Sequence, residues 1–191
     1  MSLNFFTLLQ LPETFVIDLK KLDQNYQSIQ KEIHPDRFAS LADEEKKASI
    51  KKTAEVNDAY QTLKSPIRRA EYLLHLHDIN IHDEKYTAVP QDFLMQQMEW
   101  REELETHKQN KEALEKLASD IQKNKNEIMS QLPKFFENKS NLHDAIKVTR
   151  ELNFIEKIIT CDILSNERSR KNLSFGCFED VKLVDFNAKN I

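Results

Sequence analysis

Glycine is nearly absent from this chain of 191 residues, in which Gly176 is the only one. Phosphate-binding loops, dinucleotide fingerprints and nucleophile elbows need glycine where the backbone approaches a ligand closely or takes a positive φ. The sequence therefore argues against the usual nucleotide-binding and hydrolase classes. Prolines are also few, at five, so turn signals are scarce, and we expect long helices and an all-α fold.

Cysteine is nearly as scarce, with Cys161 and Cys177 the only two. Two thiols cannot form a disulfide framework or a four-thiolate zinc or iron–sulfur site. We therefore expect no bound metal and no resident cofactor. The chain has no run of 18 apolar residues that could span a membrane. Its N-terminal sequence lacks the features of a signal or transit peptide, so we expect a cytoplasmic protein with no membrane partner.

A strong excess of charge of one sign is also missing, because 28 Lys and Arg face 32 Asp and Glu. Residues 1–77 carry 11 basic and 11 acidic side chains, and residues 78–165 carry 12 and 17. Neither segment is basic enough to follow a phosphate backbone. We therefore expect no nucleic-acid partner.

Four helices are predicted in residues 1–77 from apolar periodicity and helix-end signals. Asp18 is a plausible N-cap for the second helix, and Pro35 stops that helix because proline disfavours the α region for the residue before it. Ser65 and Pro66 form an N-cap followed by proline at the first helical position. The expected helices cover residues 5–9, 18–33, 43–64 and 66–76.

Beyond these helices, residues 78–89 are polar and carry no helical stripe, so we predict a linker with a loop. Apolar periodicity then predicts helices over residues 90–107, 111–132 and 142–163. Three antiparallel helices that share one core are expected to form a bundle. The periodicity fades after Asn166, and residues 166–191 receive no assigned role.

The sharpest motif is His34-Pro35-Asp36, followed by Arg37, in the turn between the second and third helices. Pro35 restricts the backbone, so this turn presents an imidazole and a carboxylate rigidly at the protein surface. The alternative interpretation is an ordinary turn between helices, with Asp36 as a cap.

The predicted helix over 90–107 carries two apolar stripes. One consists of Phe93, Gln97, Trp100 and Leu104. The other consists of Leu94, Met95 and Met98, edged by Glu99 and Glu102. Because one helix of a three-helix bundle cannot easily bury both stripes, we expect the aromatic stripe in the core and the methionine stripe exposed as a partner site. The pattern alone leaves open that both stripes are buried.

Several of these segments together resemble a J-domain. The resemblance is carried by Asn4–Leu9, His34–Phe38, Asn57–Leu63 and Ser65–Leu74. The particular residues in these segments are similar to those of the HscB family, the J-proteins of iron–sulfur cluster assembly. Asp92–Leu104 supports this, because it is similar to the helix with which that family binds the cluster scaffold protein.

The resemblance implies an L-shaped, all-α protein with a J-domain over residues 1–77 and a C-terminal three-helix scaffold-binding domain over 78–165. It implies a bacterial co-chaperone rather than an enzyme. Such a protein stimulates the ATPase of a DnaK-class chaperone, HscA, and delivers the scaffold protein IscU to it. A J-domain protein with another client, or a helical adaptor unrelated to chaperones, remains the alternative.

The resemblance also assigns site residues. The chaperone-binding residues are His34, Pro35, Asp36, Arg37, Lys20 and Lys31. The scaffold-binding residues are Leu94, Met95, Met98, Glu99, Glu102 and Phe154. Phe154 matches a phenylalanine on the last helix of the family. Thr106 stands where the family has a further acidic residue, which weakens the case for a contact there.

Overall fold

The computed structural model of this protein describes residues 4–33, 43–83, 86, 90–137 and 142–163. Within these residues the protein is helical and contains no strand, as the sequence predicted. The helices are α1 (Phe5–Leu8), α2 (Leu19–Ile33), α3 (Asp43–Lys64), α4 (Pro66–Leu76), α5 (Gln91–Thr106), α6 (Lys111–Met129), α7 (Leu132–Glu137) and α8 (Leu142–Lys157), which continues into the π-helical segment η4 (Ile158–Ile163).

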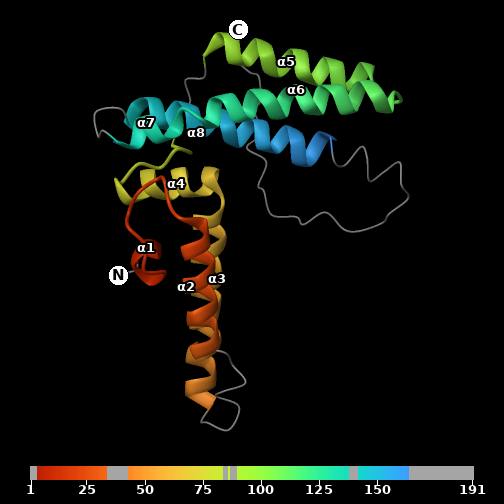
Figure 1. The fold of residues 1–191 in the computed structure, drawn as a ribbon. Helices are drawn as coiled ribbons and strands as arrows, with labels where there is room; N and C mark the ends of the chain where they lie inside the picture. Colours follow the sequence, from red (N-terminus) through yellow and green to blue (C-terminus); the bar gives the residue numbers. More distant parts are fainter. Residues whose placement is uncertain (1–3, 34–42, 84–85, 87–89, 138–141, 164–191) are drawn as a thin grey trace.

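Two arms give the molecule its L shape (Figure 1). Helices α2 and α3 form an antiparallel hairpin that projects from the rest of the protein. Helices α5, α6 and α8 lie side by side as the second arm, and their shared core includes Trp100, Leu117, Ile121 and Ile155. Helix α4 lies where the arms meet and packs against α8.

The predicted helix starts are confirmed by their capping contacts. The Asp18 carboxylate accepts hydrogen bonds from the backbone N–H groups of Lys20 and Lys21, at 2.9 and 3.2 Å. The Ser65 side chain accepts a hydrogen bond from the backbone N–H of Arg68, and Pro66 opens α4. These contacts satisfy N–H groups that lack a partner within their own helix.

The helix predicted over 111–132 is confirmed up to Met129, but its predicted end is wrong, and the structure adds a short helix that the sequence did not predict. Helix α6 ends at Met129, and Leu132 begins the short helix α7 with Pro133 in its first turn. Proline is tolerated there because the first N–H groups of a helix have no intrahelical partner. The fully buried side chain of Leu132 belongs to the same hydrophobic core as Leu152 of α8.

One hydrophobic core joins the two arms. Val148 and Leu152 of α8 belong to the cluster that contains Phe6 and Leu63 of the N-terminal part. The rings of Phe15 and Phe136, from the loop before α2 and from α7, stack with their centroids 5.2 Å apart. Side chains from both arms therefore share one packed interior, which fixes the arms relative to each other.

The described part of the predicted linker is attached to its surroundings. Ile81 is fully buried and packs with Ile146 of α8. The Arg150 guanidinium donates a 2.6 Å hydrogen bond to the Ile81 carbonyl. The His82 ring and the Glu71 carboxylate lie 2.8 Å apart. Residues 79–82 therefore contact both α4 and α8.

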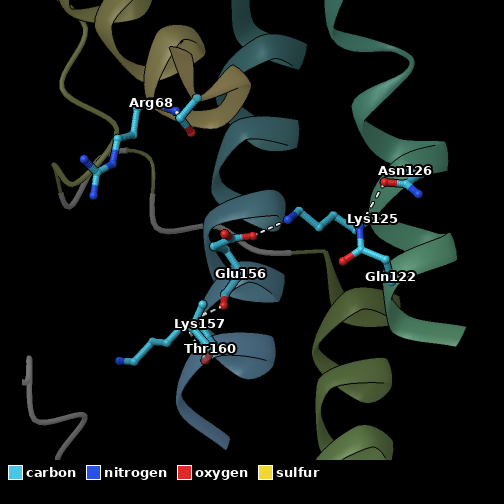
Figure 2. A network of polar contacts seen from close by, with 8 residues as sticks. Arg68, Gln122, Lys125, Asn126, Glu156, Lys157 and Thr160 are labelled. Atoms are coloured by element: carbon cyan, nitrogen blue, oxygen red, sulfur yellow. Dashed lines mark hydrogen bonds and ion pairs between the residues drawn. The ribbon is translucent and has the colours of Figure 1, made fainter. Parts of the chain in front are cut away.

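An ion pair connects two helices of the bundle. Lys125 on α6 reaches the carboxylate of Glu156 on α8 (Figure 2). The Lys125 side chain is mostly buried, so this pair is shielded from water more than a surface pair is. The Thr160 hydroxyl donates a 2.7 Å hydrogen bond to the Glu156 backbone carbonyl. The ion pair holds α6 against the C-terminal end of α8.

Candidate functional site

The predicted chaperone-binding turn lies outside the described residues. His34, Pro35, Asp36 and Arg37 belong to the interval 34–42, between the end of α2 and the start of α3. The roles assigned to these four residues therefore stay predictions. The helix ends on either side of the turn are described.

Ile33, the last residue of α2, is fixed to α3 by its backbone and its side chain. The buried Ser49 hydroxyl donates a 2.7 Å hydrogen bond to the Ile33 carbonyl. The Thr53 hydroxyl lies 3.5 Å from the same carbonyl and makes its shorter bond, of 2.9 Å, to the Ser49 carbonyl within α3. The carbonyls in the last turn of a helix have no intrahelical partner, so the Ser49 hydroxyl serves as a substitute. The residue directly before the predicted turn is thus held in place, and the sequence reasoning assigned no role to Ser49 or Thr53.

Polar and aromatic contacts connect α2 and α3 along one side of the hairpin. The rings of Tyr26 and Tyr60 stack with their centroids 4.0 Å apart. The Tyr60 hydroxyl donates a 2.8 Å hydrogen bond to Asp23, and the Tyr26 hydroxyl donates one of 2.9 Å to Asn57. The Lys64 ammonium donates to the Tyr60 hydroxyl, and this bond is the main reason why the pKa of Lys64 is raised. These contacts stiffen the hairpin that carries the predicted turn.

The two lysines predicted to guide the chaperone are exposed on α2. Lys20 and Lys31 lie on one helical face with Gln24 and Gln27, and all four side chains are exposed to solvent. Leu22 and Ile33 lie in the core. The expected exposure of both lysines is confirmed, whereas their binding role stays a prediction.

Arg69 on α4 is a buried cation with a structural role. Its guanidinium donates hydrogen bonds to the Leu63 and Phe15 carbonyls, at 2.7 and 2.8 Å, and a longer one to the Lys64 carbonyl. Burial lowers the pKa of Arg69 to about 10, because the charged form loses its hydration. Arg69 thus connects the end of α3 to the loop before α2.

Helix α5 places its two apolar stripes as predicted. Trp100 and Leu104 are 6% and 5% exposed, in the bundle core. Leu94, Met95 and Met98 are 45%, 55% and 71% exposed. The interpretation that both stripes are buried is therefore wrong. We call the exposed surface of Leu94, Met95 and Met98, together with Phe154, the α5 patch.

The acidic residues expected at the edge of the α5 patch are also exposed. Both Glu99 and Glu102 lie on the solvent side of α5. Glu99 accepts a 3.4 Å hydrogen bond from the Gln96 amide one turn earlier. An apolar surface with exposed carboxylates beside it suits a partner that has apolar side chains and nearby cations.

Phe154 reaches the α5 patch from α8. Its partly buried ring meets the Phe93 ring edge to face, with centroids 6.0 Å apart and planes at 80°. The Arg101 guanidinium carbon lies 5.3 Å from the centroid of the same ring. The structure thus brings Phe154 to α5, as the resemblance implied, and adds Arg101, to which the sequence reasoning assigned no role.

The described residues hold neither a candidate metal site nor a helix that could span a membrane. No group of three or more His, Cys, Asp or Glu side chains in this part of the chain is placed to hold a metal ion. None of the helices in it is both long enough and apolar enough to cross a membrane.

Two family models match the two arms. Residues 4–72 match the DnaJ domain, and residues 89–160 match a model described as the HSCB C-terminal oligomerisation domain. The co-chaperone protein HscB homolog of Paraburkholderia phymatum is 40% identical over 161 residues, which are 82% of this chain and 91% of that protein. The homolog of Burkholderia mallei is 37% identical over 157 residues, or 81% of this chain and 89% of that protein.

Solved structures agree with this similarity. Chaperone HscB from Vibrio cholerae superposes with a TM-score of 0.73 at 34% identity, covering 90% of this chain and 100% of that one. Human co-chaperone protein HscB superposes with a TM-score of 0.79 at 27% identity, covering 90% of this chain and 84% of that one. Both alignments extend over the hairpin arm and the bundle arm together.

Proposed function

This chain belongs to the HscB family of J-domain co-chaperones, and we propose that it delivers the iron–sulfur scaffold IscU to the DnaK-class chaperone HscA and stimulates ATP hydrolysis there. A J-domain co-chaperone of this family implies a DnaK-class partner. The observation that carries the rest of the proposal is the exposure of Leu94, Met95 and Met98 in the same chain as a J-domain.

On the chaperone side, we assign the trigger to His34, Pro35 and Asp36. The Asp36 carboxylate competes for an arginine of the chaperone, because carboxylate–guanidinium pairs are directional and strong. Lys20, Lys31 and Arg37 guide the J-domain toward an acidic surface. The exposure of both lysines supports this assignment.

On the scaffold side, we assign binding to the α5 patch and to the carboxylates of Glu99 and Glu102. Three exposed apolar side chains on adjacent turns of α5 form a surface that a monomeric protein seldom leaves without a partner. Methionine side chains adapt to the shape of their partner, which suits Met95 and Met98 to a binding surface.

We propose that the shared core couples the two binding events. A scaffold bound to the α5 patch is held at a fixed position relative to the J-domain. This raises its effective concentration at the peptide site of the chaperone. ATP hydrolysis then captures the scaffold and favours release of its cluster, which is the cargo, to acceptor proteins. The stacking of Phe15 on Phe136 supports such a fixed geometry.

The remaining assignments follow from this role. We place the J-domain at residues 1–77 and the scaffold-binding domain at 78–165, with residues 78–89 between them, and we propose that the protein works in the cytoplasm. Residues 166–191 lie outside the described part of the chain and receive no role.

The test is the rate of ATP hydrolysis by HscA, measured with the full-length chain, with IscU and with both. We expect the chain alone to raise the rate of ATP hydrolysis. The chain and IscU together should raise it by more than the sum of their separate effects. An unchanged rate with the chain would favour a helical adaptor unrelated to chaperones. Stimulation that IscU does not alter would instead indicate a J-protein with another client.

A further inference from the structure

Phe154 is the one member of the α5 patch that comes from another helix. Leu94, Met95 and Met98 are attached to α5, so the helix itself fixes their spacing. The Phe154 ring, on α8, becomes part of the same surface only if contacts with α5 fix its direction. Two α5 side chains make defined contacts with this ring: the Phe93 ring meets it edge to face, and the Arg101 guanidinium lies over it. The ring also packs against the bundle core that contains Trp100.

We infer that Arg101 is a positioning residue of the scaffold-binding surface, whose guanidinium holds the Phe154 ring against α5 beside Leu94 and Met98. This inference deepens the proposed function and rests on it. A cation over an aromatic face is attracted by the negative charge density of the ring. Arg101 is exposed, so this contact forms without removing the guanidinium from water.

The spacing along α5 explains how the ring is held. Phe93 and Arg101 are eight residues apart, or about 12 Å along the helix axis. Gln97 lies midway between them on the same face and is buried. The ring is therefore contacted by side chains on both sides of Gln97. Leu94 and Met98 follow Phe93 and Gln97 by one residue each, so they lie on the adjoining strip of the helix surface.

The guanidinium has no competing partner among the described residues. No ion pair or hydrogen bond of the Arg101 side chain is formed within this part of the chain, which leaves the Phe154 ring as its contact. The rival explanation is that Arg101 binds the scaffold directly through its charge. The two explanations differ in whether the effect of Arg101 depends on Phe154.

A double-mutant cycle separates them, with cluster-free IscU as the probe and the full-length chain throughout. Binding is measured by calorimetry for the wild type, Arg101→Gln, Phe154→Ala and the double variant. Lys116→Gln is the matched control, since it removes one exposed positive charge from α6, whereas the cation over the Phe154 ring is Arg101. The NMR signals of the Phe154 ring in the free chain report its position independently of binding.

Arg101→Gln is expected to weaken IscU binding about two- to fivefold, as the loss of one exposed cation–π contact predicts. In the Phe154→Ala background, Arg101→Gln should not weaken IscU binding further. Arg101→Gln should also shift the NMR signals of the Phe154 ring, whereas Lys116→Gln should not. Arg101→Lys, which keeps a cation but loses the planar guanidinium, should restore binding in part.

Equal losses from Arg101→Gln with and without Phe154 would overturn the inference, because Arg101 would then act on the scaffold directly. Ring signals that Arg101→Gln leaves unchanged would overturn it as well. A wild-type chain that fails to bind IscU would refute the proposed function itself, and the inference with it. The two kinds of failure are therefore distinguishable.

Discussion

The Ser49 hydroxyl on α3 donates a buried 2.7 Å hydrogen bond to the backbone carbonyl of Ile33, the residue directly before His34. The bond joins the two helices of the hairpin at the end that carries the predicted chaperone-binding turn. Ser49, in the first third of α3, therefore fixes the last residue of α2.

Replacing Ser49 with alanine should lower the free energy of unfolding by about 1–2 kcal/mol, because the Ile33 carbonyl loses its buried donor. Stimulation of the chaperone ATPase should fall severalfold, while IscU binding stays unchanged. Urea unfolding, ATPase rates and calorimetry measure the three effects. Ser28→Ala, at an exposed position of α2, is the control and should change none of them. Full ATPase stimulation by Ser49→Ala would contradict a role in positioning the turn.

Asp36→Asn should abolish ATPase stimulation, because a neutral amide cannot form the ion pair with an arginine of the chaperone. IscU binding should persist, since the α5 patch lies on the other arm. ATP turnover and calorimetry on the same preparation test both statements. Asp58→Asn, on the exposed side of α3, should retain both activities. If Asp36→Asn lost both activities together, the two binding sites would not be separate.

Met98→Glu should weaken IscU binding at least about tenfold, because a carboxylate pressed against an apolar partner surface loses its hydration. The melting temperature should hardly change, because the Met98 side chain is 71% exposed. Val16→Glu introduces the same charge at a similarly exposed apolar position outside α5 and should leave IscU binding intact. A large drop in melting temperature would mean that Met98 belongs to the core.

Leu152→Ala should lower the free energy of unfolding by about 2–5 kcal/mol, the usual cost of emptying a buried leucine site. Leu152 lies in the core shared by both arms. Both arms should therefore unfold together, in a single transition at a lower urea concentration than in the wild type. Urea unfolding followed by Trp100 fluorescence and by circular dichroism tests this, because Trp100 reports on the bundle alone. Leu94→Ala, at an exposed site, should cost far less. Two separate transitions would show that the arms fold independently.

Glu151→Gln should stabilise the protein at neutral pH. Burial of the half-buried Glu151 side chain raises the pKa of its carboxyl above the ordinary 4.5, and Lys147 offsets part of the effect. The folded state thus holds this proton more tightly than the unfolded state. The contribution of the Glu151 carboxyl to the free energy of unfolding is therefore fully present below pH 4.5, and it is lost as the pH rises through the pKa of the folded state.

The gain from Glu151→Gln should be below about 1 kcal/mol at pH 7, because the carboxyl is partly solvated, and it should vanish below pH 4. Urea midpoints across this pH range measure it, with exposed Glu127→Gln on α6 as the control. An equal gain at both ends of the range would assign the effect to something other than ionisation.

The sequence predicted the features that depend on neighbours along the chain. Asp18 and Ser65 start helices because their side chains accept hydrogen bonds from N–H groups two or three residues ahead. Helical spacing predicted the two stripes of α5, and the structure showed that Trp100 is buried and Met98 is exposed. The resemblance brought Phe154 to the α5 patch, although its role in binding stays a prediction.

Contacts between distant residues were not predictable in this way. Pro133 is a local signal that a helix ends near it, but the apolar spacing of Ile128 and Leu132 continues that of one helix, so the local pattern does not show that Leu132 already belongs to α7. The break between α6 and α7 places Leu132 in the core with Leu152, on another helix. Similarly, Ser49 and Arg101 are ordinary surface-type residues in sequence and gain their significance from Ile33 and Phe154, which other helices bring to them.

By itself, then, the sequence determined the helical fold, most helix boundaries, the two apolar stripes of α5 and the resemblance to J-proteins, because these depend on the order and spacing of residues within a segment. Only the tertiary structure decided that both arms share one core, that α3 anchors the end of α2 and that Arg101 lies over Phe154. Such contacts arise from packing between segments that are far apart in the chain, and no local pattern of residues encodes which surfaces will meet.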